Sequence, residues 1–156
     1  GDKIETELSG LGFYTPSARQ KSRNRKIAEA LLSFRRRAVP TVNAEAANVI
    51  TVDLQIKDGG DTDVDEVTTV AAWLYDDNMA EASAAAFRLA ETGAGAEVST
   101  TAKGGLILTT DANGVAQLSV TDVAGGSGAP MRLVVETMPN SGLKQGHRDL
   151  VAITFD

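Results

Sequence analysis

The stretch Val49–Ile56, VITVDLQI, alternates apolar and polar side chains from end to end. Successive side chains of a β-strand point to opposite faces of a sheet, so this alternation predicts a strand with one buried and one solvated face. Five later segments have the same character and are also predicted to be strands. They are Val67–Tyr75, Leu106–Thr110, Val115–Thr121, Met131–Thr137 and Asp149–Phe155.

Short turns rich in glycine, aspartate and asparagine, such as KDGGD and DANG, separate these segments. Six short strands with frequent turns over roughly 110 residues are typical of an antiparallel β-sandwich. Within it we expect Trp73 in the core, and we expect the turn Asp111–Gly114 to close a hairpin between two strands. The alanine-rich segment Ala80–Glu91 is predicted to be a short helix or an irregular crossover.

A helical period precedes the first strand. Ser17 with Gln20 three residues later matches a capping box, and Pro40 ends the helix because the residue before a proline avoids helical geometry. We therefore predict an amphipathic helix over about 17–38, within an arm of residues 1–43 that precedes a sandwich of residues 44–156. The apolar stripe of this helix consists of Ile27, Ala30, Leu31, Phe34 and Ala38. Its basic row consists of Arg19, Arg23 and Lys26. Further apolar anchors are expected at Leu8, Leu11, Phe13 and Tyr14.

The charge of the chain is divided along its length. Residues 1–40 carry a net charge of +5 and residues 41–156 carry −11, which together give the formal net charge of −6. A basic arm on an acidic domain indicates that the arm has a partner of its own. The arm can dock as a helix into an acidic protein, fold against its own sandwich, or bind the phosphates of a nucleic acid.

Most catalytic chemistry is disfavoured by composition. The chain has no cysteine and one histidine, which excludes thiolate nucleophiles and multi-histidine metal sites. The acidic segment Asp58–Glu66 is expected to be a solvated loop, with a weak cation site as the alternative. We expect no enzyme activity, no cofactor, no metal, no signal peptide and no membrane segment. The candidate site is instead a partner-binding set formed by Arg19, Arg23, Lys26, Ile27, Leu31, Phe34, Arg35, Arg36 and Arg37.

Residues 44–156 resemble a group of small structural proteins of tailed bacteriophages. The resemblance is carried by five ordered segments, which do not include the basic arm. They are EAANVITVDLQIKD (45–58), VAAWLYDD (70–77), GGLILTTDANGVAQLSVTD (104–122), MRLVVETMPNSGL (131–143) and VAITFD (151–156). The resemblance implies an immunoglobulin-like sandwich in a capsid decoration or cement protein, and the family has no catalytic residues to carry over.

The expected function is accordingly that of a virion protein, located on the capsid surface after assembly in the host cytoplasm and anchored by its arm to the major capsid protein or another virion protein. A tail or head–tail connector component is the alternative within the particle. A nucleic-acid-binding protein that uses the basic helix is the alternative from another class, and self-association into a homo-oligomer also stays open.

Overall fold

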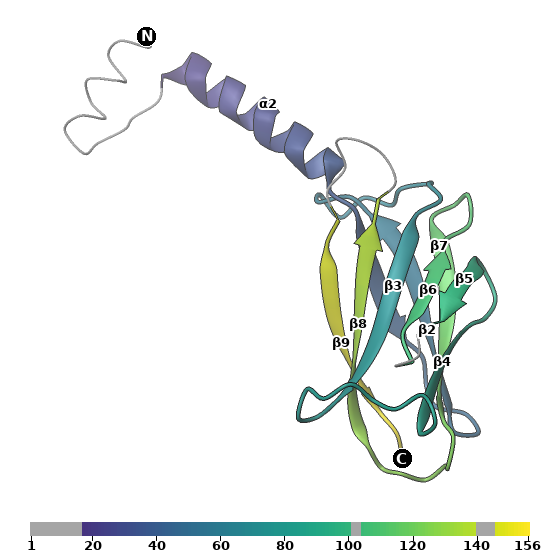
Figure 1. Ribbon diagram of the computed structural model, residues 1–156. Helices are drawn as coiled ribbons and strands as arrows, with labels where there is room; N and C mark the ends of the chain where they lie inside the picture. The colour runs from purple at the N-terminus through teal and green to yellow at the C-terminus, as the bar shows by residue number, and fades with distance from the viewer. Residues whose placement is uncertain (1–16, 101–103, 140–145) are drawn as a thin grey trace.

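The computed structural model describes residues 17–100, 104–139 and 146–156. These residues form one helix followed by nine strands (Figure 1). In chain order they are α2 (Ala18–Phe34), β1 (Arg37–Val42), β2 (Val49–Lys57), β3 (Thr69–Asp76), β4 (Phe87–Glu91), β5 (Ala96–Thr100), β6 (Leu106–Thr109), β7 (Val115–Asp122), β8 (Pro130–Met138) and β9 (Arg148–Thr154). The expected anchors Leu8, Leu11, Phe13 and Tyr14 lie outside the described residues.

The strands form two antiparallel sheets, with the orders β1-β2-β7-β4 and β5-β6-β3-β8-β9. The strand order of an immunoglobulin constant-type domain is repeated by the four-stranded sheet together with β3-β8-β9 of the five-stranded sheet. Strands β5 and β6 extend the five-stranded sheet. The prediction of a mainly β, immunoglobulin-like antiparallel sandwich preceded by one helix is therefore confirmed. The helix projects from one end of the sandwich, away from both sheets (Figure 1).

The core lies between the two sheets and is built from the inward residues of the alternating strands. In β2, every second side chain is buried, and the same alternation runs through β7. Phe87 and Phe155 close the core at one end, with ring centroids 5.6 Å apart. The largest fully buried side chains are Phe155, Leu54, Ile56, Leu106, Leu108, Leu118, Leu133, Ile153, Val52, Val70, Val120 and Val135.

The end of the predicted helix and the start of the sandwich differ from expectation. The helix ends at Phe34 rather than near residue 38, and residues 37–42, which were expected in the arm, form strand β1. Ala38, placed on the helical stripe by its spacing, is instead buried in the sandwich core. The proline that was expected to end the helix lies within β1 as the partner of Leu54, which is possible because β1 is an edge strand.

The sheet order also corrects the expectation for the turn Asp111–Gly114. The turn Asp111–Gly114 joins β6 and β7, which lie in opposite sheets, so it carries the chain across the sandwich rather than closing a paired hairpin. The carboxylate of Asp111 accepts the N–H groups of Asn113 and Val115, and Gly114 has a φ of +71°. A side chain on Gly114 would overlap the carbonyl oxygen of Val64, which explains the glycine.

Trp73 is also not a core residue. Its neighbours Ala72 and Leu74 point into the core, so the indole lies on the outer face of the five-stranded sheet and is partly exposed. Of the segment Ala80–Glu91, the first part is irregular and the second part is β4.

The outer face of the four-stranded sheet is polar and internally hydrogen-bonded. Asp53 accepts hydrogen bonds from the side-chain amides of Asn43 at 3.0 Å and Gln117 at 2.7 Å. The hydrogen bond from Asn43, followed by that from Gln117, lowers the pKa of Asp53 below its ordinary value, because both favour the charged form. The side chains of Asn43, Asp53 and Gln117 on this face therefore bind one another.

We predict that this network stabilises the fold in a pH-dependent way. The pKa of Asp53 is lower in the folded chain than the unfolded value of about 3.9, so its contribution is complete above that pH and is lost as the pH falls through the folded pKa. Urea unfolding of the protein and of Asp53→Asn should show a difference in unfolding free energy that shrinks on acidification below about pH 4. A difference that stays constant with pH would contradict the role of the charged carboxylate.

Candidate partner-binding helix

Helix α2 begins at a well-formed cap. The side-chain oxygen of Ser17 accepts a hydrogen bond from the backbone N–H of Gln20 at 3.1 Å, as the capping box predicts. The helix then runs away from the sandwich, so most of its length has no neighbour among the described residues (Figure 1). Its surface is therefore available to another molecule.

The apolar stripe of α2 is exposed. Ile27, Leu31 and Phe34 are 53%, 64% and 39% exposed, respectively. The alternative in which the helix folds its stripe against its own sandwich is therefore not adopted by these three residues. The side chain of Ala30, the fourth expected member within the helix, is outside the described part of the chain.

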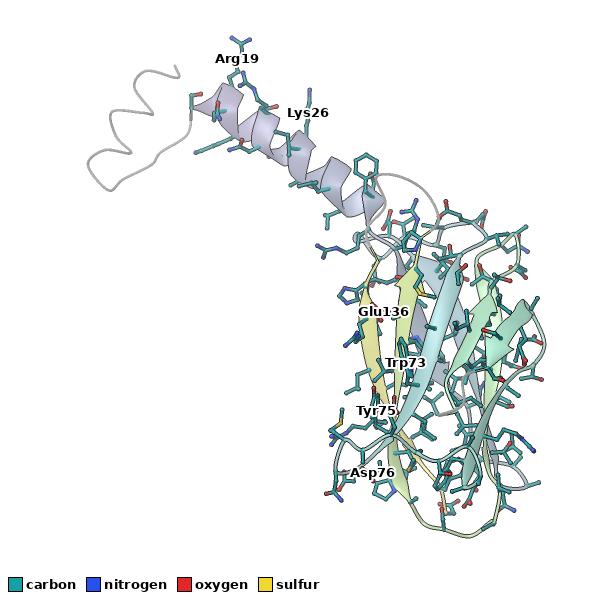
Figure 2. All side chains as sticks on the ribbon, in the orientation of Figure 1. Arg19, Lys26, Trp73, Tyr75, Asp76 and Glu136 are labelled. Atoms are coloured by element: carbon teal, nitrogen blue, oxygen red, sulfur yellow. The ribbon has the colours of Figure 1, made fainter. Side chains whose placement is uncertain are left out.

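The basic row of α2 is exposed as well. Arg19, Arg23 and Lys26 are spaced by four and three residues, which places them on one side of a helix. Figure 2 shows Arg19 and Lys26 pointing outward from the same side. Among the side chains that the structure describes, none of these three cations forms an ion pair, and Lys21 and Arg25 are likewise exposed and without one.

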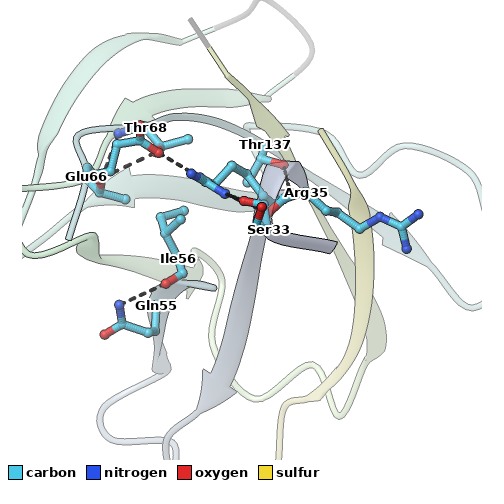
Figure 3. A network of polar contacts seen from close by, with 9 residues as sticks. Ser33, Arg35, Gln55, Ile56, Glu66, Thr68 and Thr137 are labelled. Carbon is cyan, nitrogen blue, oxygen red and sulfur yellow. Dashed lines mark hydrogen bonds and ion pairs between the residues drawn. The ribbon is translucent and has the colours of Figure 1, made fainter. Parts of the chain in front are cut away.

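Arg36 has a different position, because it joins the helix to the sandwich. Its side chain is buried, and its guanidinium group donates to the carbonyl oxygens of Ser33 at 2.6 Å and Arg35 at 3.0 Å. The same group forms an ion pair with Glu66 at 2.8 Å. Figure 3 shows Ser33, Glu66 and Thr137 gathered around this junction. Arg36 thus binds two carbonyl groups at the end of the helix.

Two hydrogen bonds to backbone carbonyl groups complete the junction. The hydroxyl of Thr137 donates to the carbonyl oxygen of Arg36 at 2.6 Å, and the N–H of Gly59 donates to the carbonyl oxygen of Leu32 at 2.8 Å. A Cβ on Gly59 would lie 2.9 Å from that oxygen, so only glycine allows the helix end to come this close. The end of α2 is therefore held from two sides, by the loop that contains Gly59 and by strand β8.

Arg37 is occupied in the same region. Its guanidinium group lies 2.8 Å from Asp149 and 3.8 Å from Asp61. The hydrogen bond from Arg37 to Asp149 raises the pKa of Arg37, outweighing the opposing effect of desolvation. Arg36 and Arg37, both expected to contact a partner, thus bind acidic side chains of their own sandwich. Of the three consecutive arginines, only Arg35 lacks an ion pair within the described residues.

The acidic segment Asp58–Glu66 is held by internal contacts. The Asp58 carboxylate accepts the backbone N–H groups of Gly60 and Thr62, and Asp63 pairs with Lys57 at 2.8 Å. In the described part of the chain, no cluster of three or more metal-ligating side chains is present. The same residues include no helix long and apolar enough to cross a membrane.

Sequence reasoning missed the residues that hold the junction. Glu66, Thr137 and Asp149 lie far along the chain from the arginines they bind, and an isolated acidic or hydroxyl residue in a strand gives no sign of a distant partner. The only available signal was the run Arg35–Arg37, which begins where the helical stripe ends.

We predict that Arg36 sets the direction of the helix. The chain has no cysteine, so a pair of spin labels can be placed at Lys21→Cys on α2 and Ser119→Cys on β7 without interference. Arg36→Met keeps the alkyl packing but removes every polar contact of the guanidinium group, so the distribution of distances between the labels should broaden by pulsed EPR. Arg35→Met is the matched control and should leave the distribution unchanged. Equal widths in both variants would contradict the role of Arg36.

No family model and no curated protein sequence matches this chain. Among solved structures, the GAE domain of GGA2p from Saccharomyces cerevisiae is similar at 11% identity and a TM-score of 0.31, over 75% of this chain and 86% of that one. The yeast GGA1 GAE domain has 9% identity and a TM-score of 0.31, over 75% and 87%. ACE19, the collagen-binding subdomain of the Enterococcus faecalis surface protein ACE, has 9% identity and a TM-score of 0.33, over 77% and 92%. Scores at this level are low, so the fold assignment depends on the strand order of the chain itself.

Proposed function

We propose that this chain is a non-enzymatic structural protein of a tailed-bacteriophage particle, in which α2 anchors the sandwich to another virion protein. The resemblance of residues 44–156 to phage virion proteins supports the particle as the setting. The single observation that carries the anchoring role is the exposed surface of α2, where an apolar stripe runs beside free cations. A capsid decoration protein is the form of this function that the resemblance favours.

The length and isolation of α2 support a docking role. A helix of 17 residues is marginal in water unless its apolar face packs against something. Among the described residues, α2 contacts the sandwich at its last turn, where the carbonyl oxygen of Leu32 accepts the N–H of Gly59. Full burial of Ile27, Leu31 and Phe34 in a partner would stabilise the complex by roughly 1.5–3 kcal/mol for each side chain. A partner would therefore stabilise the helix as well as bind it.

The charges of α2 support an acidic partner surface. Cations around an apolar stripe are the usual rim of a helix that docks into a groove, where arginine pairs with carboxylates. Aromatic side chains that stack on bases are absent from the basic row itself, which is made of Arg19, Arg23 and Lys26. Protein docking is accordingly favoured over nucleic-acid binding.

We predict that the apolar stripe is required for binding to particles. Ile27→Gln with Leu31→Gln keeps a good helix former at both positions but removes the apolar contact, so the affinity for particles should fall at least about a hundredfold. The measurement is co-sedimentation of the purified protein with particles that lack it. Ala18→Gln with Ala28→Gln, two exposed positions off the stripe and off the basic row, is the matched control and should bind as the unaltered protein does.

A charge variant distinguishes the two classes of partner. Replacing Arg19, Arg23 and Lys26 by glutamine should weaken protein docking moderately and reduce its salt dependence. A nucleic-acid-binding helix would instead lose duplex binding with this variant and keep it with the stripe variant. Particle binding that survives loss of the stripe would refute the anchoring role.

A further inference from the structure

The two sheets have outer faces of opposite character. The outer face of the four-stranded sheet carries the polar network around Asp53. The outer face of β3, β8 and β9 instead carries Trp73, Tyr75, Val134 and Leu150, of which Leu150 is 56% exposed and Val134, between its larger neighbours, only 5%. Figure 2 shows Glu136, Trp73, Tyr75 and Asp76 following one another along this sheet. An aromatic and aliphatic patch with charged flanks has the composition of a protein interface.

Strand register arranges this patch in three rows across β3, β8 and β9. The pairings of β3 with β8 and of β8 with β9 fix which outward residues are neighbours. The central row is apolar, and each outer row contains one arginine. In order across the three strands, the rows are Ala71–Glu136–Arg148, Trp73–Val134–Leu150 and Tyr75–Arg132–Ala152.

The charges of the outer rows lie at equal distances from the centre of the patch. On β8, Arg132 and Glu136 are each two residues from Val134, on opposite sides of it. Consider a second copy packed face to face, with a two-fold axis that passes over Val134 and runs across the strands. This axis reverses the strand direction, so Arg132 of each copy meets Glu136 of the other. The central strand of the patch, β8, is therefore complementary to itself in charge.

The same operation makes the patch complementary to itself in size. On β3, Tyr75 of one copy comes opposite Ala71 of the other, which is only 3% exposed among larger neighbours. On β9, Arg148 comes opposite Ala152. On these two flanking strands, the large side chains Tyr75 and Arg148 thus each face an alanine. A shallow hollow beside Val134, lined also by Trp73 and Leu150, offers room for side chains to interdigitate as they do between packed sheets.

Charges within each copy prepare the patch for this contact. Glu136 is paired with Arg148 at 3.2 Å, and Arg132 with Asp77 at 3.6 Å. Both pairs are at least partly exposed, so each contributes little to the stability of a single copy. Between two faces they would be shielded from water and joined into a larger network, in which the pairing between copies fixes the register.

We propose that the outer face of β3, β8 and β9 binds a second copy of this chain, as an antiparallel two-fold dimer centred on Val134. In a two-fold interface the same patch is used by both copies, so it must be complementary to itself. The opposed charges of β8 and the size pairing of β3 and β9 meet this requirement together. The contact is separate from α2 and does not depend on the proposed anchoring role.

Charge reversal at the two central positions of β8 tests the dimer. Glu136→Arg sets cations against cations across the axis, and Arg132→Glu sets anions against anions, so sedimentation analysis should show self-association weakened at least about tenfold in each. An equimolar mixture of the two variants restores both opposite-charge contacts and should dimerise like the unaltered protein. An unfolded variant could not be rescued in this way.

A substitution in the central row provides a second test. Leu150→Lys places two ammonium groups face to face and should also abolish self-association, whereas Val123→Lys, at a comparably exposed valine outside the patch, should not. Three results would overturn the proposal. They are a monomer at every concentration, dimerisation that survives both charge reversals, and dimerisation that is lost with Ile27→Gln and Leu31→Gln alone, which would assign the contact to α2.

Discussion

The exposed surface of α2 depends on the guanidinium group of Arg36. At the end of the helix this group binds the carbonyl of Ser33 and, on its other side, the carboxylate of Glu66 in the sandwich. Helix and sheet meet here with only two residues between them, and the hydroxyl of Thr137 holds the carbonyl of Arg36 itself. These contacts hold the helix in a direction that points away from both sheets. The apolar stripe of α2 is left in solvent for that reason.

Much of the fold could be predicted from the sequence, because six strands bury one face each and so alternate visibly. The three strands that were missed lack this signal. In β5 every residue is exposed, and β4 lies at the end of the alanine-rich segment Ala80–Glu91, whose composition favours a helix. The first strand begins at the third of three consecutive arginines and contains a proline, both of which indicate the end of an element rather than the middle of one. Its place in the sheet is set by pairing with β2, which local sequence does not encode.

The candidate site divides in a similar way. The stripe and the basic row of α2 follow from helical spacing alone, so Ile27, Leu31, Arg19, Arg23 and Lys26 could be identified in advance. The separate roles of the arginines in the run Arg35–Arg37 could not be predicted, because these residues differ only in what lies beside them in space. The patch around Val134 was also hidden, since Trp73 alternates with core residues and a strand pattern does not say which of its faces is inside.

The two surfaces together suggest a particular use. The two-fold axis proposed for the sheet face reverses the strands, and α2 leaves each sandwich from one end. A dimer would therefore carry its helices at opposite ends, separated by roughly the 30 Å length of a nine-residue strand. Two helices so placed cannot enter adjacent grooves of one small partner. They would connect two partner molecules, so that dimerisation would turn an anchored sandwich into a link between neighbouring subunits, as a cementing role requires.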